Sequence, residues 1–244
     1  FHWNIIILLI YSIISYRLNL NFMNIKIYFK RQVFSKTDAN LILFVDEKFN
    51  INGLKKHISD SEYSYISDLL KTKDIKKKIL TFDINSKKKI ILVSLKKNLK
   101  NFDAENLGAK CFDIFTELKK THYSINSDSL PKGSNNIIGY FLHGIKLKSY
   151  KFEKYKTKKN KSNISINVTG KKIPDYKDQL KFSSLEEGTF YTRDLVSEPG
   201  NVLHPDEYAR RIRSLSKFGL KINVYDEKKL KKLGMNTLLG VGQG

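Results

Sequence analysis

Residues that could bind a metal ion or act in acid–base catalysis do not cluster in this sequence of 244 residues. No two of its histidines lie within five residues of each other, and the zinc-protease pattern H-E-x-x-H is absent. Neighbouring carboxylates occur at Glu186-Glu187 and at Asp226-Glu227, spaced as ordinary surface pairs. The histidines are His2, His57, His122, His143 and His204. Chemistry alone therefore predicts no preassembled metal site and no visible catalytic site.

The last five residues, Gly240 to Gly244, read Gly-Val-Gly-Gln-Gly and invite a phosphate-binding interpretation. A P-loop needs G-x-x-x-x-G-K-[ST], whose Lys and hydroxyl group hold phosphates and Mg²⁺, and no Lys follows these glycines. A dinucleotide fingerprint needs a strand before its glycines and a helix after them. Here a short helix is expected before the glycines instead. The spacing therefore favours a structural glycine-rich turn.

The single cysteine and one histidine are predicted to have structural roles. Cys111 shares a predicted helix face with Leu107, Ile114 and Leu118, where a small buried hydrophobic residue is expected. A nucleophilic cysteine would need a His partner, and the sequence pairs none with it. His143 lies beside the apolar stripe of another predicted helix, which favours a structural residue over a ligand. One cysteine also excludes a disulfide framework and a cysteine-based zinc cluster.

The formal net charge is +21, from 45 Lys and Arg residues against 24 Asp and Glu residues. Such a balance raises nucleic acid or an anionic membrane surface as a partner. Only six of the basic residues are Arg, the residue preferred for bidentate phosphate and guanine contacts, so AT-rich codon usage is the favoured explanation. The segment Lys151–Lys161 is strongly basic and is expected to be a solvated connector. A phosphate-binding patch with interleaved Phe152 and Tyr155 is the alternative.

The first 22 residues differ from the globular pattern that starts after Met23. Residues 4–14 form a mostly apolar run, shorter than the about 20 residues of a spanning helix. The basic start and A-x-A-like cleavage site of a signal peptide are missing. We interpret residues 1–22 as upstream sequence translated in frame, with a hydrophobic membrane or signal segment as the alternative. The chain begins with Phe1 and lacks a polar tail, so a fragment of a longer protein is expected.

From Met23 onward short strands alternate with helices, which predicts an α/β domain. Helices are expected over 62–70, over 103–119 with Asp103 as N-cap, and from about Ser134. Gly139 and Gly144 in the last of these indicate the close approach of another backbone. Its buried stripe is Ile138, Phe141, Leu142 and Ile145. The expected strands are Ile25–Phe29, Leu41–Val45, Ile79–Phe82, Ile90–Val93 and Ile164–Val168.

The last third of the chain continues with helices and one strand. After a polar linker at 174–179, a helix is expected over 182–198, and Pro199-Gly200 ends it. A second helix is predicted to start at Pro205, and a short one to run from Glu227 to Gly234. Leu220, Ile222 and Val224 alternate as in a strand. The packing face expected for the first of these helices is Leu185, Gly188, Thr189, Thr192, Leu195 and Val196.

The string from Glu187 to Ala209, E-G-T-F-Y-T-R-D-L-V-S-E-P-G-N-V-L-H-P-D-E-Y-A, resembles the leucyl (cytosol) aminopeptidase family. That family carries R-D-L-V-N/S-E-P-x-N, a strand like L-K-I-N-V-Y-D-E, and L-G-M-x-x-L-L-G-V-G-Q-G. These motifs occur here in order at Arg193–Asn201, Leu220–Glu227 and Leu233–Gly244. Ser149–Thr157 looks like the S-Y-x-F-x-x-Y-K motif that closes the family's N-terminal domain. The resemblance spans Met23 to Gly244 and is most specific after Glu187.

The resemblance implies an α/β fold with a macro-domain-like N-terminal domain, a connecting helix and the truncated start of an α/β metallopeptidase catalytic domain. The implied boundaries are 23–170, 171–198 and 199–244. It also implies a cytoplasmic homo-hexamer that uses two divalent metal ions, Mn or Zn, to release N-terminal residues, Leu preferentially, from peptides. In such a site the water that bridges the metals attacks the scissile carbonyl.

The family's catalytic and metal-binding residues have no counterpart in this sequence. They lie in motifs of the V-G-K-G-x-x-F-D-[ST]-G-G and N-T-D-A-E-G-R-L kinds, beyond the Gly-Val-Gly-Gln-Gly string. No catalytic, cofactor-binding or metal residue is therefore carried over to any position here. We expect residues 1–244 alone to be inactive.

Two other functions stay open at this stage. A Lys-rich nucleic-acid-binding surface would give a salt-dependent shift of duplex DNA. A macro-type module would bind ADP-ribose, but no suitable glycine-rich loop occurs in residues 23–168, and resemblance of fold does not transfer a site. We further expect residues 23 to about 168 to fold alone. Residues 199–244 are expected to be mobile or aggregation-prone without the rest of their sheet.

Overall fold

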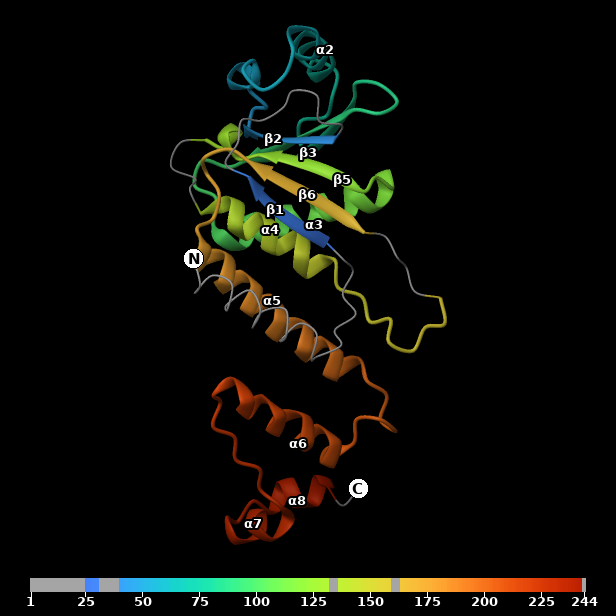
Figure 1. Ribbon diagram of the computed structural model, residues 1–244, viewed down its shortest axis with the longest axis vertical. Helices are drawn as coiled ribbons and strands as arrows, with labels where there is room; N and C mark the ends of the chain where they lie inside the picture. The colour runs from blue at the N-terminus through green and yellow to red at the C-terminus, as the bar shows by residue number, and fades with distance from the viewer. Residues whose placement is uncertain (1–24, 31–39, 132–135, 159–162, 243–244) are drawn as a thin grey trace, which may run out of the picture. The chain divides into compact units, whose positions relative to one another are not determined.

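The structure, a computed structural model, describes residues 25–30, 40–131, 136–158 and 163–242 (Figure 1). The interpretation of residues 1–22 therefore lies outside the described residues. The chain divides into two compact units, residues 1–191 and 192–244. Within the described ranges, no helix combines the length and the apolar character needed to cross a membrane.

The elements of the first unit follow the alternation expected from the sequence. The strands are β1 (Ile25–Lys30), β2 (Asn40–Asp46), β3 (Ile79–Asp83), β4 (Lys89–Leu95), β5 (His122–Asn126) and β6 (Ile164–Thr169). The helices are α2 (Asp60–Leu70), α3 (Asn101–Leu118), α4 (Ile137–Lys148) and α5 (Tyr176–Ser197), whose last turns enter the second unit. Short 3₁₀ helices lie at Asn52–Leu54 and Ser127–Ser129.

The six strands form one sheet in the order β1-β6-β5-β2-β4-β3. All neighbours pair in parallel except β3, which pairs with β4 in antiparallel fashion. Strand β2 lies in the interior of the sheet, and its apolar residues Leu41, Leu43 and Val45 are buried on one side while Ile42 and Phe44 are buried on the other. The continuous apolar run in the sequence follows from this two-sided burial.

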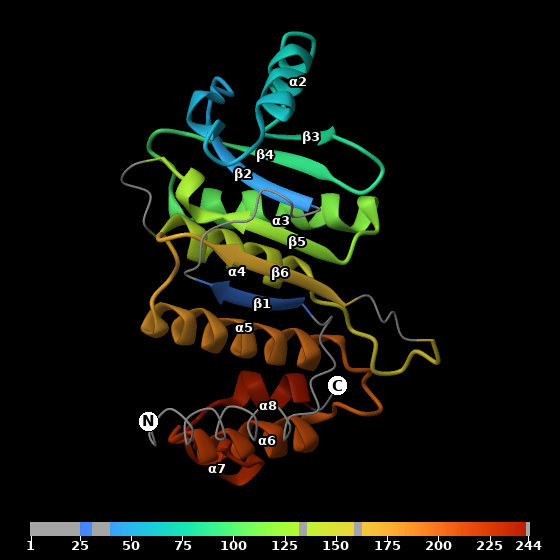
Figure 2. The same ribbon diagram turned by 45° about the horizontal axis from the view of Figure 1, so that its top comes forward.

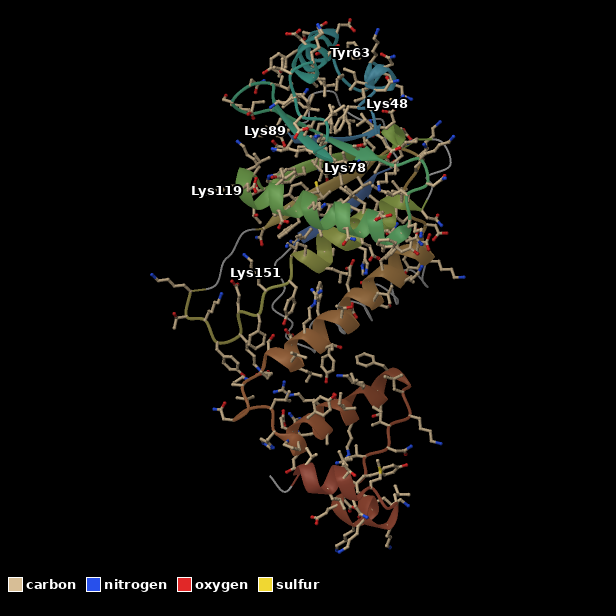
Figure 3. All side chains as sticks on the ribbon, turned by 180° about the vertical axis from the view of Figure 1, so that it is seen from behind. Lys48, Tyr63, Lys78, Lys89, Lys119 and Lys151 are labelled. Atoms are coloured by element: carbon tan, nitrogen blue, oxygen red, sulfur yellow. The ribbon has the colours of Figure 1, made fainter. Side chains whose placement is uncertain are left out.

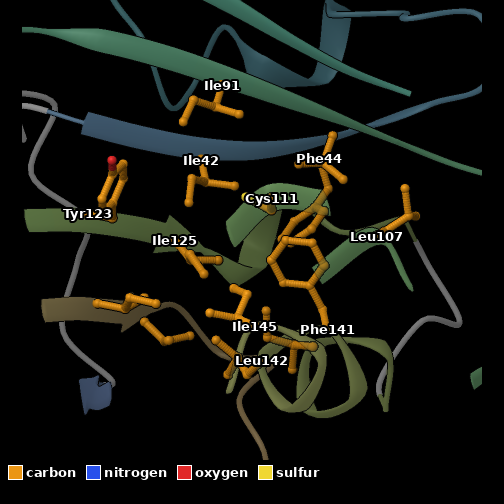
Figure 4. Close-up of a cluster of buried hydrophobic side chains, with 14 of the residues drawn as sticks. Ile42, Phe44, Ile91, Leu107, Cys111, Tyr123, Ile125, Phe141, Leu142 and Ile145 are labelled. Atoms are coloured by element: carbon orange, nitrogen blue, oxygen red, sulfur yellow. The ribbon is translucent and has the colours of Figure 1, made fainter. Parts of the chain in front are cut away.

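Helices α3 and α4 cover one face of the sheet, and α2 packs on the other (Figure 2). The larger core lies between the sheet and α3 and α4, where the Phe44 and Phe141 rings meet edge to face with centroids 5.3 Å apart (Figure 4). A mostly parallel sheet with helices on both faces is the arrangement of an α/β domain. The fold class predicted from the sequence is confirmed.

Helices α3 and α4 approach each other at their glycines. A Cβ built on Gly108 would lie 1.9 Å from the carbonyl oxygen of Phe141, and one built on Gly144 would lie 1.9 Å from that of Glu105. Gly139 faces the ring of Phe182 at 2.5 Å in the same way. The predicted approach of another backbone is confirmed at Gly144, whereas Gly139 faces a side chain and not a backbone.

Strand β5 and the start of α3 differ from the sequence prediction. Strand β5 was not expected, since three of its five residues are polar. Asp103 is not the N-cap of α3, because the helix begins at Asn101 with Lys100 as N-cap and Asp103 lies in the first turn. There its carboxylate favours the helix dipole instead of capping it.

Helix α5 begins earlier than the sequence prediction, and it buries another face. It starts at Tyr176 because the Asp175 side chain accepts a hydrogen bond from the Asp178 amide at 2.8 Å, so part of the expected linker is helical. Phe182 and Phe190 are buried, whereas Leu185 and Val196 of the expected packing face are 49% and 81% exposed. Leu195 of that face is buried, so the predicted face is wrong for Leu185 and Val196 and right for Leu195.

In the second unit, the expected helix start at Pro205 and the short helix from Glu227 are confirmed. The helices are α6 (Pro205–Arg213), α7 (Glu227–Lys232) and α8 (Asn236–Gly242), with a 3₁₀ helix at Ser214–Phe218. The strand predicted over 220–224 is absent from the described unit, where these residues have no strand partner. Leu220 is 55% exposed and Val224 is 36% exposed, because alternation alone forms no strand without a neighbour.

Candidate functional site

The carboxylates weighed for metal chemistry in the sequence have other contacts in the structure. Among the described residues, no group of three or more His, Cys, Asp or Glu side chains could hold a metal ion. Asp226 caps α7, because its side chain accepts a hydrogen bond from the Lys229 amide at 2.8 Å. Glu186 faces His143, with Oε1 3.2 Å from Nδ1. The donor set of a two-metal centre therefore does not exist in the described part of this chain.

Cys111 is fully buried in the core between the sheet and α3 (Figure 4). Burial raises the pKa of its thiol far above the ordinary value. A protonated, inaccessible thiol is a poor nucleophile, which agrees with the structural role expected from the sequence.

The Gly-Val-Gly-Gln-Gly string is helical where the structure describes it. Gly240 and Gly242 lie within α8, so the turn predicted from the spacing is wrong for these residues, and Gln243 and Gly244 lie outside the described residues. No atoms lie within 4 Å of a Cβ built on either glycine. Neither glycine is therefore required here by close packing.

The lysines of the basic surface come from many elements. The labelled Lys89 is the first residue of β4, and the labelled Lys48, Lys78, Lys119 and Lys151 lie in the connections next to other strands and helices (Figure 3). Several other lysines are bound to acids, as Lys88 is to Glu62 at 2.5 Å. The described part of the basic segment has Phe152 and Tyr155 in edge contact at 5.8 Å, and Lys154 lies over the Tyr155 ring at 5.3 Å.

A pocket of about 300 Å³ lies in the first unit between β1, α4 and the start of α5. Figures 1 and 2 both show α5 running alongside β1, the edge strand of the sheet. Apolar side chains form most of the wall, and these are Ile27, Phe29, Leu142, Leu180 and Phe182. A concave, mostly apolar cavity with a few polar groups is the usual form of a small-molecule site.

Two opposite charges border this pocket. Lys146 of α4 donates a hydrogen bond from Nζ to the carbonyl oxygen of Ile25 at 2.7 Å. Burial lowers the pKa of Lys146, and the nearby Glu186 carboxylate opposes that effect. Glu186 of α5 is held by His143, whose ring also lies 5.2 Å from the Phe182 ring. The sequence analysis singled out His143 and Glu186 separately and missed Lys146.

The charged side chains of the second unit form an ion-pair network around Arg211. Its guanidinium binds Glu198 at 2.9 Å through Nη1 and Glu207 at 2.8 Å through Nε. Arg210 binds both carboxylate oxygens of Glu207 at 2.6 Å. Glu198 belongs to the R-D-L-V-S-E-P-G-N string, so this motif is tied to the last turn of α6.

Residues 190–244 match the family model described as the cytosol aminopeptidase family, catalytic domain. A probable cytosol aminopeptidase of Clostridium perfringens is 28% identical over 236 aligned residues, which cover 88% of this chain and 46% of that protein. One from Nitrobacter winogradskyi is 44% identical over 108 residues, covering 41% of this chain and 21% of that protein. The chain thus spans less than half the length of either relative.

Solved structures show the same fold. A tomato leucine aminopeptidase mutant superimposes with a TM-score of 0.69 at 18% identity, covering 88% of this chain and 47% of that chain. The bottromycin maturation enzyme BotP in complex with Mn gives a TM-score of 0.56 at 14% identity, with 80% and 40% covered. The solved structures thus share the fold, and the resemblance drawn from the sequence motifs is confirmed by the family model and the relatives.

Proposed function

Because the chain is related to the cytosol aminopeptidase family, we propose that it forms part of a metal-dependent leucyl aminopeptidase. The match of residues 190–244 to the family's catalytic-domain model is the observation that carries this proposal. The reaction would release N-terminal residues, Leu among them, from peptides. In this proposal residues 23–170 are the N-terminal domain, 171–198 the connection and 199–244 the first elements of the catalytic domain.

The residues described here do not supply the metal site that such a reaction requires. No group of three potential ligands exists among them, so no catalytic step is assigned to any of their side chains. A Mn complex of BotP, a neighbour in fold, supports a divalent metal in the whole protein, and Zn is the alternative. The proposal includes a cytoplasmic location, in keeping with the name of the relatives. It also includes the hexamer that the resemblance of the sequence motifs implies.

The proposal assigns residues 1–244 the role of a scaffold without activity of its own. The purified chain should not hydrolyse Leu-p-nitroanilide with added Mn²⁺ or Zn²⁺, because the described residues lack the ligand set. A protein extended to the length of the Clostridium relative should hydrolyse it, and a chelator should abolish that activity. Metal-dependent turnover by the 244-residue chain would overturn the assigned role. An inactive extended protein would overturn the proposed function.

A further inference from the structure

The pocket between β1, α4 and α5 combines apolar walls with one positive and one negative group. Its volume, about 300 Å³, is at the low end of the range for small-molecule sites, so it suits a compact ligand. Lys146 enters from α4 and Glu186 from α5, while the apolar side chains come from all three elements. Gln179 and Ser183 add two further polar groups at its border.

The two charged groups retain hydrogen-bonding capacity. Lys146 carries three N–H donors, and the hydrogen bond to the carbonyl oxygen of Ile25 uses one of them. Glu186 has two carboxylate oxygens, and Oε1 is the one that contacts His143. The ion pairs of the described residues, taken within 4.0 Å, do not join Lys146 to Glu186. A donor and an acceptor of opposite charge thus border one cavity without forming a direct ion pair.

We propose that this pocket binds a free α-amino acid with an apolar side chain. The ligand's carboxylate would bind Lys146, its ammonium group would bind Glu186, and its side chain would lie against Ile27, Phe29 and Leu142. An α-amino acid carries both charges on one carbon, so a single small molecule satisfies both protein groups. His143 acts as a positioning residue, because its contact with Glu186 fixes that carboxylate.

Other ligand classes fit the pocket less well. An anion such as a nucleotide phosphate would be repelled by Glu186, and a metal cation would be repelled by Lys146. A purely apolar molecule would leave both charges without a new partner when it displaced water from the pocket. The zwitterion is the one class among these that matches each charge and the apolar wall. This site goes beyond the proposed peptidase function.

A ligand series on the 244-residue chain tests the proposal without any substitution. We expect L-leucine to bind saturably with a Kd of about 1 mM or tighter, measured by calorimetry and by chemical-shift changes of α4 and α5. L-leucinamide lacks the carboxylate and N-acetyl-L-leucine lacks the ammonium group, so each should bind about tenfold more weakly or worse. L-aspartate should also bind weakly, because its second carboxylate would lie on the apolar wall. Absence of leucine binding, or equal binding of leucinamide, would overturn the proposal.

Variants then assign the two contacts. Lys146→Met and Glu186→Gln should each weaken leucine binding by about tenfold or more. Lys148→Met on the same helix and Glu117→Gln on α3 are the matched controls, since neither residue lines the pocket, and both should bind as the unaltered chain does. Circular dichroism checks that each variant folds. Full affinity in a folded Lys146→Met variant would overturn the assignment, and the ligand series decides if that variant fails to fold.

Discussion

Gly144 of α4 lies against the backbone of Glu105 in α3, where an added Cβ would stand 1.9 Å from the Glu105 carbonyl oxygen. Gly108 of α3 meets the Phe141 carbonyl oxygen at the same distance in the opposite direction. The two helices therefore approach through a reciprocal pair of glycines. This approach places α4 against the sheet and presents Lys146 to the pocket beside β1.

The first prediction concerns this crossing. Gly144→Ala should destabilise the first unit by about 1–3 kcal/mol, because the new methyl group meets a main-chain oxygen that cannot move independently. The measurement is the free energy of unfolding in urea. Gly188→Ala in α5 is the matched control, since no atom lies within 4 Å of its built Cβ. That control should be neutral or stabilise the chain by about 0.5–1 kcal/mol. Equal changes in unfolding free energy for the two substitutions would contradict the close approach of α3 and α4 at Gly144.

The second prediction concerns the capping box of α2. The Ser59 side chain accepts a hydrogen bond from the Glu62 amide at 3.3 Å. The Glu62 carboxylate accepts a hydrogen bond from the Ser59 amide at 2.9 Å. Ser59→Ala should therefore cost about 1 kcal/mol of unfolding free energy. Ser64→Ala, at an exposed position in the same helix, should change it by less than about 0.5 kcal/mol. A neutral Ser59→Ala would mean that the cap does not stabilise the unit.

The sheet was largely predictable because its strands are buried on both faces or alternate clearly. β2 and β4 are mostly continuous apolar runs, and such a run predicts a buried strand even when its neighbours in the sheet are not known. β5 was missed because its buried Ser124 and Asn126 look like loop residues in sequence. Asn126 is satisfied by a 2.8 Å contact between its Nδ2 and Nδ1 of His57, which lies 69 residues away. The sequence around Asn126 does not indicate that distant partner.

The pocket could not be predicted, for a similar reason. The buried face of α5 includes the charged Glu186 between Phe182 and Phe190, so it does not look like an apolar stripe. Its charge is acceptable because His143 of α4 faces it, and that contact exists only after the helices pack. The strand expected at 220–224 failed for the opposite reason. The apolar residues alternate clearly there, but the described residues provide no partner strand.

The third prediction is a pH dependence in the second unit. Hydrogen bonds from Arg210 and Arg211 lower the pKa of Glu207 to about 2 from its ordinary value of 4.5. The stabilising effect is therefore present above about pH 4.5 and is lost as the pH falls through about 2. An NMR titration of the Glu207 carboxyl carbon measures this value directly. Added salt should move it back towards 4.5, because the Glu207 side chain is still partly open to solvent ions that screen the pairs.

A matched variant separates this ion-pair network from general acid effects. Arg211→Gln removes one donor, so the pKa of Glu207 should rise while its pairing with Arg210 remains. Arg213→Gln is the control, because Arg213 lies on the same helix and makes none of the contacts with Glu207. A Glu207 that titrates at its ordinary pKa in the unaltered chain would contradict the network.

The fourth prediction concerns the unequal stability of the two units. The described helices α6, α7 and α8 contain no buried residue, and Leu220, Leu233 and Leu238 are each 50% exposed or more. Burial of one such side chain is worth about 1.5–3 kcal/mol, so the second unit lacks the main source of folding free energy. It should therefore open easily to a protease.

Limited trypsin digestion with mass spectrometry tests this inequality. We expect early cuts after Arg193 and the arginines of α6, and a surviving core that ends near residue 191. The boundary lies beyond Lys171 and Lys181 because Phe182 and Phe190 are buried, with Phe182 against Tyr140 at 5.0 Å and Phe190 against Tyr150 at 5.6 Å. Phe182→Ala should release α5 and move the cuts to Lys171 and Lys181, whereas Leu185→Ala on the exposed side should not. A resistant segment over 199–244 would refute the prediction, because it would require burial that the exposed helices do not provide.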